Sequence, residues 1–227
     1  MGCGTGATTI ELSSRVQPGG KVTGVDISEP LILRARDRAR AHEARIDFEL
    51  ADASRHPFAA GAFDVLFSRF GIMFFDDPEG AFGHLRAALA PGGRAAFVCW
   101  RDVAENEWFS VPYRAARKVL PQQPPPDPYA PGPFAFGDRD RLESILHRGG
   151  FTGVTITAFD ATLYTAGSVD EALDQSMRVG PLARMLAEHS EDVRQRGVAA
   201  IRAELAERAT AEGVALGGAT WIVTAHA

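Results

Sequence analysis

Segments with strand periodicity alternate with segments of helical periodicity over the first part of this 227-residue chain. Strand patterns fall at residues 21–26, 46–52, 63–71 and 94–100, and helical patterns at 7–15, 28–45 and 76–90. The run at 63–71 is almost continuously apolar, as expected of a strand covered on both faces. This alternation predicts an α/β fold: a doubly wound, mostly parallel sheet with helices on both faces.

The alternation breaks after Trp100. Residues 121–137 are so rich in proline that they predict an extended loop. After this loop the sequence predicts a helix capped by Asp138 and then a strand at 152–164. A second helix opens with a capping box of Ser168 and Glu171. A helix from about 190 to 212 and a last strand at 219–225 complete the chain. We expect a single domain over residues 1–227. Its segments 101–137 and 168–217 are expected to be helical lid insertions that cover the substrate.

Composition excludes several classes of partner. With 24 Lys and Arg against 29 Asp and Glu, the net charge of -5 offers no broad basic surface for nucleic acid or an anionic membrane. The basic stretch at 34–45 predicts the solvated face of a helix. No apolar run approaches the roughly 20 residues of a membrane span. We therefore expect a soluble, cytoplasmic protein with a small-molecule partner, and the sequence leaves the oligomeric state open.

The two cysteines and the histidines give no site of their own. Cys3 and Cys99 are too far apart for a CxxC motif, and two cysteines are too few for a disulfide framework. The six histidines are scattered without ligand spacing, so no metal site is expected.

The chain opens on a glycine-rich loop, "GCGTG". Gly2, Gly4 and Gly6 permit a tight turn that lets backbone amides approach a ligand, and a helix follows from near Ala7. Asp26 lies 20 residues beyond Gly6, at the end of the next predicted strand, where a carboxylate can accept ribose hydroxyls. The same stretch satisfies G-x-G-x-x-A, so the loop alone does not separate a nicotinamide enzyme from other nucleoside binders.

Five segments in order resemble the class I S-adenosylmethionine-dependent methyltransferases, of the type that includes ubiquinone and menaquinone methyltransferases. They are "GCGTG", "GVDIS", "ELADAS", "FDVLFSRFGIMFFDDP" and "LAPGGRAAFVCW". The resemblance runs to about Trp100 and resumes weakly in the last strand. It implies a Rossmann-like fold with an antiparallel last strand, S-adenosylmethionine as cofactor, and methyl transfer to a small hydrophobic or aromatic metabolite. The alternative is a non-catalytic remnant or a nicotinamide-nucleotide-binding domain.

The resemblance also implies roles for single residues. Those that would border the methionine part of the cofactor are Gly2, Cys3, Gly4, Thr5 and Gly6. Asp26 would hold the ribose, with Ile27 as an apolar platform beside the adenine. Asp52 would accept the adenine amine, and the Ala53 amide would meet a ring nitrogen.

The acceptor side is less defined. Ser68 and Arg69 would lie where cofactor and acceptor meet. Trp108 or Phe136 is expected to contact the acceptor. No catalytic base is assigned, because alignment in a dry site can supply much of the rate. His56 is expected to be a loop residue and His84 a solvent-exposed helix residue.

The chain departs from the resemblance at its start. In related sequences a strand ending in an acidic residue precedes the first glycine, whereas here only Met1 does. That strand is central in the family sheet, so without it two strand edges lack a partner. Three explanations stand: a misplaced start, a fragment, or direct pairing of the strands around Val25 and Val65.

Overall fold

The computed structural model describes residues 1–16, 18–42, 44–121, 127–165, 167–178 and 182–227, and they form two compact units. The first unit comprises Met1–Cys99, Tyr129–Thr157 and Trp221–Ala227, and the second Trp100–Pro128 and Ala158–Thr220. Most of the two predicted insertions falls in the second unit, but residues 129–137 belong to the first. Part of the predicted proline-rich loop, 122–126, lies outside the described residues.

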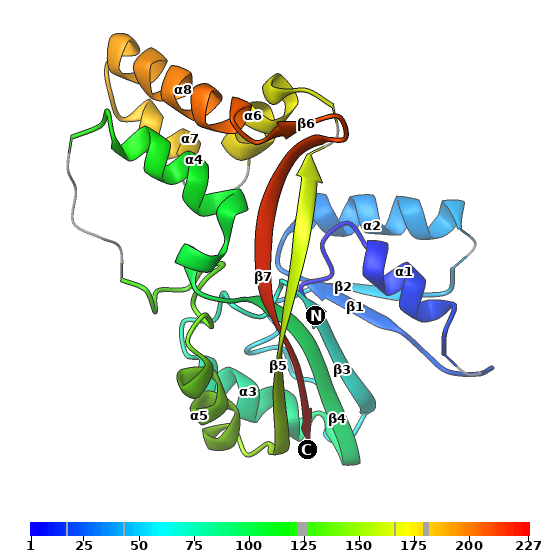
Figure 1. Cartoon of the computed structure of the whole chain (residues 1–227). Helices are drawn as coiled ribbons and strands as arrows, with labels where there is room; N and C mark the ends of the chain where they lie inside the picture. Colours follow the sequence, from blue (N-terminus) through cyan, green and yellow to red (C-terminus); the bar gives the residue numbers. More distant parts are fainter. Residues whose placement is uncertain (17, 43, 122–126, 166, 179–181) are drawn as a thin grey trace. The chain divides into compact units, whose positions relative to one another are not determined.

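The first unit begins with a small parallel sheet. Helix α1 (Ala7–Ser13) follows the glycine loop, and α2 (Glu29–Ala41) joins strand β1 (Thr23–Asp26) to β2 (Asp47–Leu50) (Figure 1). Ile32, Ala35 and Ala39 of α2 pack against Phe48 of β2. This β-α-β unit brings the ends of β1 and β2 to one edge of the sheet, because the strands are parallel.

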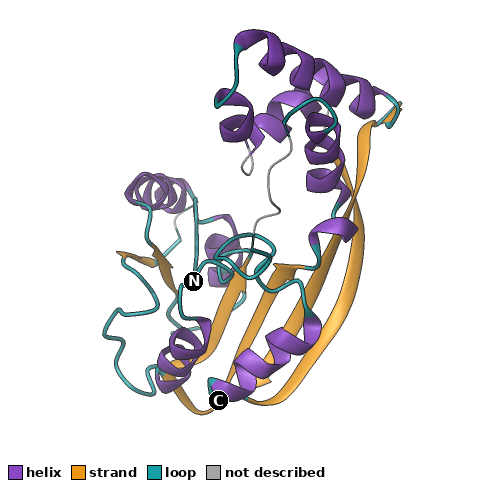
Figure 2. Cartoon of the chain, turned by 90° about the vertical axis from the view of Figure 1, so that its left-hand side faces the viewer, coloured by secondary structure: helices purple, strands orange, loops and turns teal. Residues whose placement is uncertain are grey.

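A larger sheet has the strand order β3-β4-β7-β5. Its strands are β3 (Phe63–Arg69), β4 (Leu89–Trp100), β5 (Thr152–Thr165) and β7 (Gly213–His226), with the short β6 (Ala209–Thr210) on β7. Strands β3 and β4 are parallel and are joined by α3 (Pro78–Ala87). Strand β7 runs opposite to β5 (Figure 1), and the strands lie side by side in Figure 2. The predicted α/β fold with an antiparallel last strand is confirmed.

An aromatic cluster forms much of the core of the first unit. The ring of Phe82 on α3 lies 5.8 Å from that of Phe97, 6.0 Å from Phe136 and 6.1 Å from Phe151. All four side chains are fully buried. Helix α5 (Arg139–Arg148) lies against α3, and Asp138 caps it by accepting from the Arg141 amide, as predicted.

The second unit is mainly helical. It contains a 3-10 turn, η1 (Val103–Glu105), and the helices α4 (Glu107–Arg117), α6 (Val169–Arg178), α7 (Leu182–Ala187) and α8 (Glu191–Ala206). The predicted capping box at the start of α6 is confirmed: the Ser168 amide donates to Glu171 at 3.1 Å, and the Glu171 amide to the Ser168 hydroxyl at 3.3 Å.

Two sequence expectations about single elements were wrong, the end of one helix and the burial of one strand. Helix α8 ends at Ala206 rather than near residue 212, because Ala209 and Thr210 pair with β7. Strand β3 is not covered on both faces, and Val65 at its centre is 44% exposed.

The sheet is divided between β1 and β3. Among the described residues, β1 pairs with β2 and β3 pairs with β4, so direct pairing around Val25 and Val65, one of the three explanations above, does not occur. In the part of the chain that the structure describes, β1 and β3 therefore each have one edge without a strand partner.

Within the described ranges, no helix combines the length and the apolar character that a membrane crossing requires.

Candidate cofactor site

The three glycines of the opening loop have different roles. Gly2, Gly4 and Gly6 all have positive φ angles, of 58°, 52° and 79°, which residues with a side chain rarely adopt. A Cβ on Gly4 would meet nothing within 4 Å, whereas a Cβ on Gly6 would lie 3.0 Å from the Cβ of Ala35. Gly4 therefore faces open space, and Gly6 allows the loop to pack on α2.

Asp26 anchors the glycine loop to the end of β1. Its Oδ2 accepts a 2.7 Å hydrogen bond from the Gly4 amide, and its Oδ1 accepts one of 3.0 Å from the Ser28 amide. The Cys3 amide adds a 3.0 Å bond to the carbonyl of Val25. A carboxylate oxygen can accept a second hydrogen bond, so both oxygens of Asp26 keep capacity for ligand hydroxyls.

Asp52 follows the neighbouring strand. The Ala51 amide donates to the Asp26 carbonyl at 3.0 Å, which holds the ends of β1 and β2 together. The Ser54 hydroxyl, at 2.7 Å from Oδ1, and then the Ser54 amide, at 2.9 Å, lower the pKa of the Asp52 carboxyl. Two carboxylates thus lie at the ends of adjacent parallel strands, where α/β sheets bind their ligands.

An exposed aliphatic side chain lies beside these acids. Ile27, directly after β1, is 72% exposed, an uncommon position for an isoleucine next to a buried strand. The Ala53 side chain, in contrast, packs with Val25 and Leu85 in a small core cluster. The site therefore offers both polar acceptors and an apolar surface.

Ser68, at the end of β3, carries a buried hydroxyl. It is 1% exposed, and its hydroxyl has no hydrogen-bond partner among the described residues. It lines a cavity of about 260 Å³ together with Gly2, Gly4 and Thr5. A buried hydroxyl without a partner is rare in folded proteins, and a ligand group in this cavity would satisfy it. Arg69, the next residue, is exposed and lines the same cavity.

The segment after β3 packs closely on the glycine loop. A Cβ on Gly71 would lie 2.6 Å from the Cα of Gly2, so neither residue has space for a side chain. Phe70, the residue before Gly71, has a φ of 59°, which is rare for a residue with a side chain. Sequence patterns did not indicate this contact, because it joins residues that are distant in the chain.

Two further loop residues have partners that the sequence did not reveal. Arg38 of α2 donates to the carbonyl and the hydroxyl of Thr5, at 3.3 and 3.0 Å. The basic stretch of α2 was expected to be a solvated face, but its residue Arg38 also binds the glycine loop. Burial, and then the charge of Asp26, raise the pKa of the Cys3 thiol to about 11, so this thiol stays protonated near neutral pH.

Both histidines considered as bases make structural contacts in the first unit. His56 Nε2 lies 2.9 Å from Glu49 Oε2, and the ring packs edge-on against Phe58 at 4.6 Å. His84 Nε2 lies 2.7 Å from the carbonyl of His56, so the expectation that His84 is solvent-exposed was wrong.

The two aromatic residues expected at the acceptor differ in environment. Phe136 is 2% exposed and belongs to the aromatic core described above, which leaves it no surface for a ligand. Trp108 is half-buried in the second unit, where its Nε1 donates to Asn106 at 3.1 Å and its ring lies 4.9 Å from that of Trp100.

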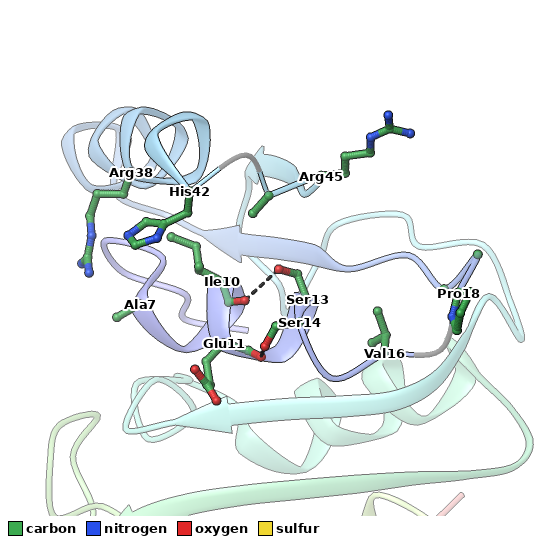
Figure 3. Close-up of a pocket in the computed structure, with 13 residues that line it drawn as sticks. Ala7, Ile10, Glu11, Ser13, Ser14, Val16, Pro18, Arg38, His42 and Arg45 are labelled. Carbon is green, nitrogen blue, oxygen red and sulfur yellow. Dashed lines mark hydrogen bonds between the residues drawn. The ribbon is translucent and has the colours of Figure 1, made fainter.

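A larger hollow of about 700 Å³ lies elsewhere, beside the last turns of α1 and α2. Figure 3 shows it lined by residues such as Glu11, Arg38 and His42, with the Ser13 hydroxyl bonded to Ile10. Helix C-termini carry partial negative charge, and the strand ends with their carboxylates are not part of this lining. Neither Asp26 nor Asp52 therefore contributes to this hollow. No cluster of three potential metal ligands occurs among the described residues.

A glycine loop that leads into a helix, with acids at the ends of the next two strands, defines a nucleoside-binding α/β domain. The model of the family described as "Methyltransferase domain" matches residues 1–93. Residues 1–93 are therefore similar to methyltransferase domains, and the fold is the Rossmann-like methyltransferase fold.

Individual relatives agree with this family. The chain is 42% identical over 122 residues to the demethylmenaquinone methyltransferase of Thermus thermophilus, covering 53% of this chain and 54% of that protein. The chain thus spans about half the length of the curated relatives that it matches. YcgJ of Bacillus subtilis has a similar fold, with a TM-score of 0.64 at 15% identity, over 99% of this chain and 88% of that one. Phosphoethanolamine N-methyltransferase 2 of Haemonchus contortus, solved with S-adenosyl-L-methionine, also has a similar fold. Its TM-score is 0.56 at 19% identity, over 99% of this chain and 47% of that one.

Proposed function

We propose that this chain binds S-adenosylmethionine at the ends of β1, β2 and β3 and transfers its methyl group to a small hydrophobic or aromatic metabolite. The observation that carries the proposal is the position of Asp26 and Asp52 at the ends of two paired parallel strands, with the glycine loop bonded to Asp26. One nucleoside can contact Asp26, Asp52 and the glycine loop together only if these three groups lie at the same edge of the sheet.

The residues at this edge fit the parts of such a cofactor. Asp26 would hold the ribose hydroxyls, Ile27 would lie beside the adenine, and Asp52 with the Ala53 amide would meet the polar edge of the base. The loop from Gly2 to Gly6, in which Gly4 is open, would border the methionine part.

The cofactor supplies a methyl group already activated by a sulfonium, so the protein has to align the acceptor and exclude water. Ser68 lies at the end of β3 with an unsatisfied hydroxyl, which suits a residue that touches the cofactor near the acceptor. Arg69 is exposed beside it and would meet a polar group of the acceptor. His56 and His84 have partners within the protein, which supports a mechanism without either as the base.

Helix α4 of the second unit carries three half-buried aromatic side chains, Trp108, Phe109 and Tyr113, and the rings of the last two stack at 5.4 Å. Trp108 remains the candidate for contact with the acceptor, whereas Phe136 is withdrawn because it is buried in the core. The name of the Thermus relative refers to a quinone precursor, a molecule of the hydrophobic or aromatic kind proposed above. The net charge of -5 supports a protein without a nucleic-acid partner, and we propose that it acts in the cytoplasm.

Equilibrium binding separates this function from its alternative. We expect S-adenosylhomocysteine to bind with micromolar affinity and NADH not to bind, measured by titration calorimetry. NADH binding alone would favour a nicotinamide-binding domain, and no binding of either by the folded protein would favour a non-catalytic remnant. The Asp52→Asn variant should weaken S-adenosylhomocysteine binding about tenfold, since a charged acceptor becomes neutral. The matched control is Asp47→Asn, at the exposed opposite end of β2.

A further inference from the structure

Thr5 is the only residue of the glycine loop that carries a hydroxyl. The residue is half-buried, and together with Ser68 it lines the cavity of about 260 Å³ beside the loop. In the proposed function this loop borders the methionine part of the cofactor, whose free carboxylate needs hydrogen-bond donors. The group that fixes Thr5 therefore bears on how this end of the cofactor is bound.

Helix α2 holds the loop through two side chains on one of its faces. Arg38 Nη1 donates to the carbonyl oxygen of Thr5 at 3.3 Å and to its hydroxyl oxygen at 3.0 Å. Ala35 lies three residues earlier on the same helix face, and a Cβ on Gly6 would lie only 3.0 Å from its Cβ. Close packing at Gly6 and two hydrogen bonds at Thr5 thus place two successive loop residues.

Arg38 reaches Thr5 from outside the cavity that Thr5 lines. It is not among the described residues around that cavity, and it lines instead the hollow of about 700 Å³ shown in Figure 3. Among the described residues, its guanidinium donates hydrogen bonds only to Thr5. The effect of Arg38 on a ligand in the cavity therefore passes through Thr5.

The direction of the hydrogen bond decides what the Thr5 hydroxyl can do. A guanidinium only donates, so its bond occupies a lone pair of the hydroxyl oxygen. The hydroxyl hydrogen stays available to a second partner, and the neighbouring positive charge makes it a stronger donor. A hydroxyl in this state suits an anionic acceptor, such as a carboxylate, better than another cation.

We propose that Arg38 is a positioning residue for cofactor binding: it sets the Thr5 hydroxyl as a donor to the carboxylate of the methionine part of S-adenosylmethionine. Its bond to the Thr5 carbonyl keeps the loop on α2. The inference rests on the proposed function and extends it to a residue that lies outside the cofactor cavity. Arg38 then acts on the amino-acid end of the cofactor and not on the adenosine end.

Two ligands separate these two ends. S-adenosylhomocysteine carries the carboxylate, whereas 5′-methylthioadenosine lacks the amino-acid end. We expect Arg38→Met to weaken S-adenosylhomocysteine binding about tenfold and to leave 5′-methylthioadenosine binding unchanged, measured by titration calorimetry. The matched control is Arg40→Met, which removes the same charge from an exposed position of the same helix and should change neither affinity. Equal losses for both ligands in Arg38→Met, or no loss for either, would overturn the inference.

Thr5→Val tests the same link from the side of the loop. It removes the hydroxyl, nearly keeps the side-chain volume and leaves α2 intact, so it should reproduce the selective loss of about tenfold. Because Arg38 acts through Thr5, the double variant should bind S-adenosylhomocysteine about as well as Thr5→Val alone. Losses that multiply to about a hundredfold in the double variant would show that Arg38 acts by another route.

A measurement without any ligand keeps this test separate from the proposed function. The amides of Cys3, Gly4 and Gly6 are hydrogen-bonded within the loop or to β1, so their exchange reports how firmly the loop is held. We expect NMR to show exchange about fivefold faster in Arg38→Met than in Arg40→Met. Equal exchange would contradict the anchoring of the loop by Arg38. Failure of the unsubstituted chain to bind either ligand would instead contradict the proposed function itself.

Discussion

The Gly4 amide donates a 2.7 Å hydrogen bond to Oδ2 of Asp26, which joins the glycine loop directly to the end of β1. The same carboxylate is the group proposed to hold the ribose, so one residue both shapes the loop and contacts the ligand. A substitution of Asp26 therefore needs a control substitution that removes one negative charge elsewhere in the chain.

We expect Asp26→Asn to weaken S-adenosylhomocysteine binding by about tenfold or more, because hydrogen bonds to a charged acceptor contribute about 1.5–3 kcal/mol. Titration calorimetry measures the affinity, and Asp47→Asn provides the control for loss of one negative charge. Equal affinities of the two variants would contradict the role of Asp26.

We expect Gly71→Ala to destabilise the first unit by about 1–3 kcal/mol, since the added Cβ would lie 2.6 Å from the Cα of Gly2 and the backbone would have to shift. The control is Gly83→Ala within α3, where a Cβ would have its nearest non-local neighbour 3.9 Å away. That substitution should stabilise the helix by about 0.5–1 kcal/mol. Urea unfolding measures both, and opposite signs are the expected result.

We expect Ser54→Ala to raise the pKa of Asp52, because the Ser54 hydroxyl is the main group that stabilises the ionised carboxyl. A lowered pKa in the folded protein gives stability that is present at neutral pH and is lost as pH falls through that pKa. In Ser54→Ala this contribution to stability should be smaller, and the loss of cofactor affinity on acidification should begin at a higher pH. An NMR titration of the carboxyl carbon measures the shift, with Ser14→Ala, an exposed serine, as the control. An unchanged titration would contradict the assignment.

We expect Asn106→Leu to destabilise the second unit by about 2–4 kcal/mol, because four hydrogen bonds converge on this fully buried amide. Its Nδ2 donates to the carbonyls of Arg101 and Asp102, and its Oδ1 accepts from Trp108 and from the Ala219 amide. Thermal unfolding measures the loss.

The control for Asn106→Leu is Ser110→Ala in the same helix. The Ser110 hydroxyl is buried without a hydrogen-bond partner among the described residues, so its removal should change stability by less than about 1 kcal/mol. A larger loss in Ser110→Ala than in Asn106→Leu would contradict the importance of the Asn106 network.

Local patterns in the sequence predicted a large part of the fold. Apolar periodicity indicated the order of strands and helices, and Asp138 and the Ser168–Glu171 pair indicated helix starts that the structure confirms. Asp26 was found because a strand is a short local signal and its last residue lies at a known edge of a parallel sheet, whereas Asp52 was found through the resemblance to the methyltransferases. These features depend on neighbours within a few positions in the chain.

Other features depended on contacts between residues far apart in the sequence. Packing decided the approach of Gly71 to Gly2, the burial of the Ser68 hydroxyl, the bond from Arg38 to Thr5 and the division of the sheet between β1 and β3. Periodicity tells which face of an element is apolar but not which element covers it. The sequence alone therefore determined the α/β class and pointed to the two acids, whereas only the tertiary structure decided how the loop is held and that β1 and β3 do not pair with each other among the described residues.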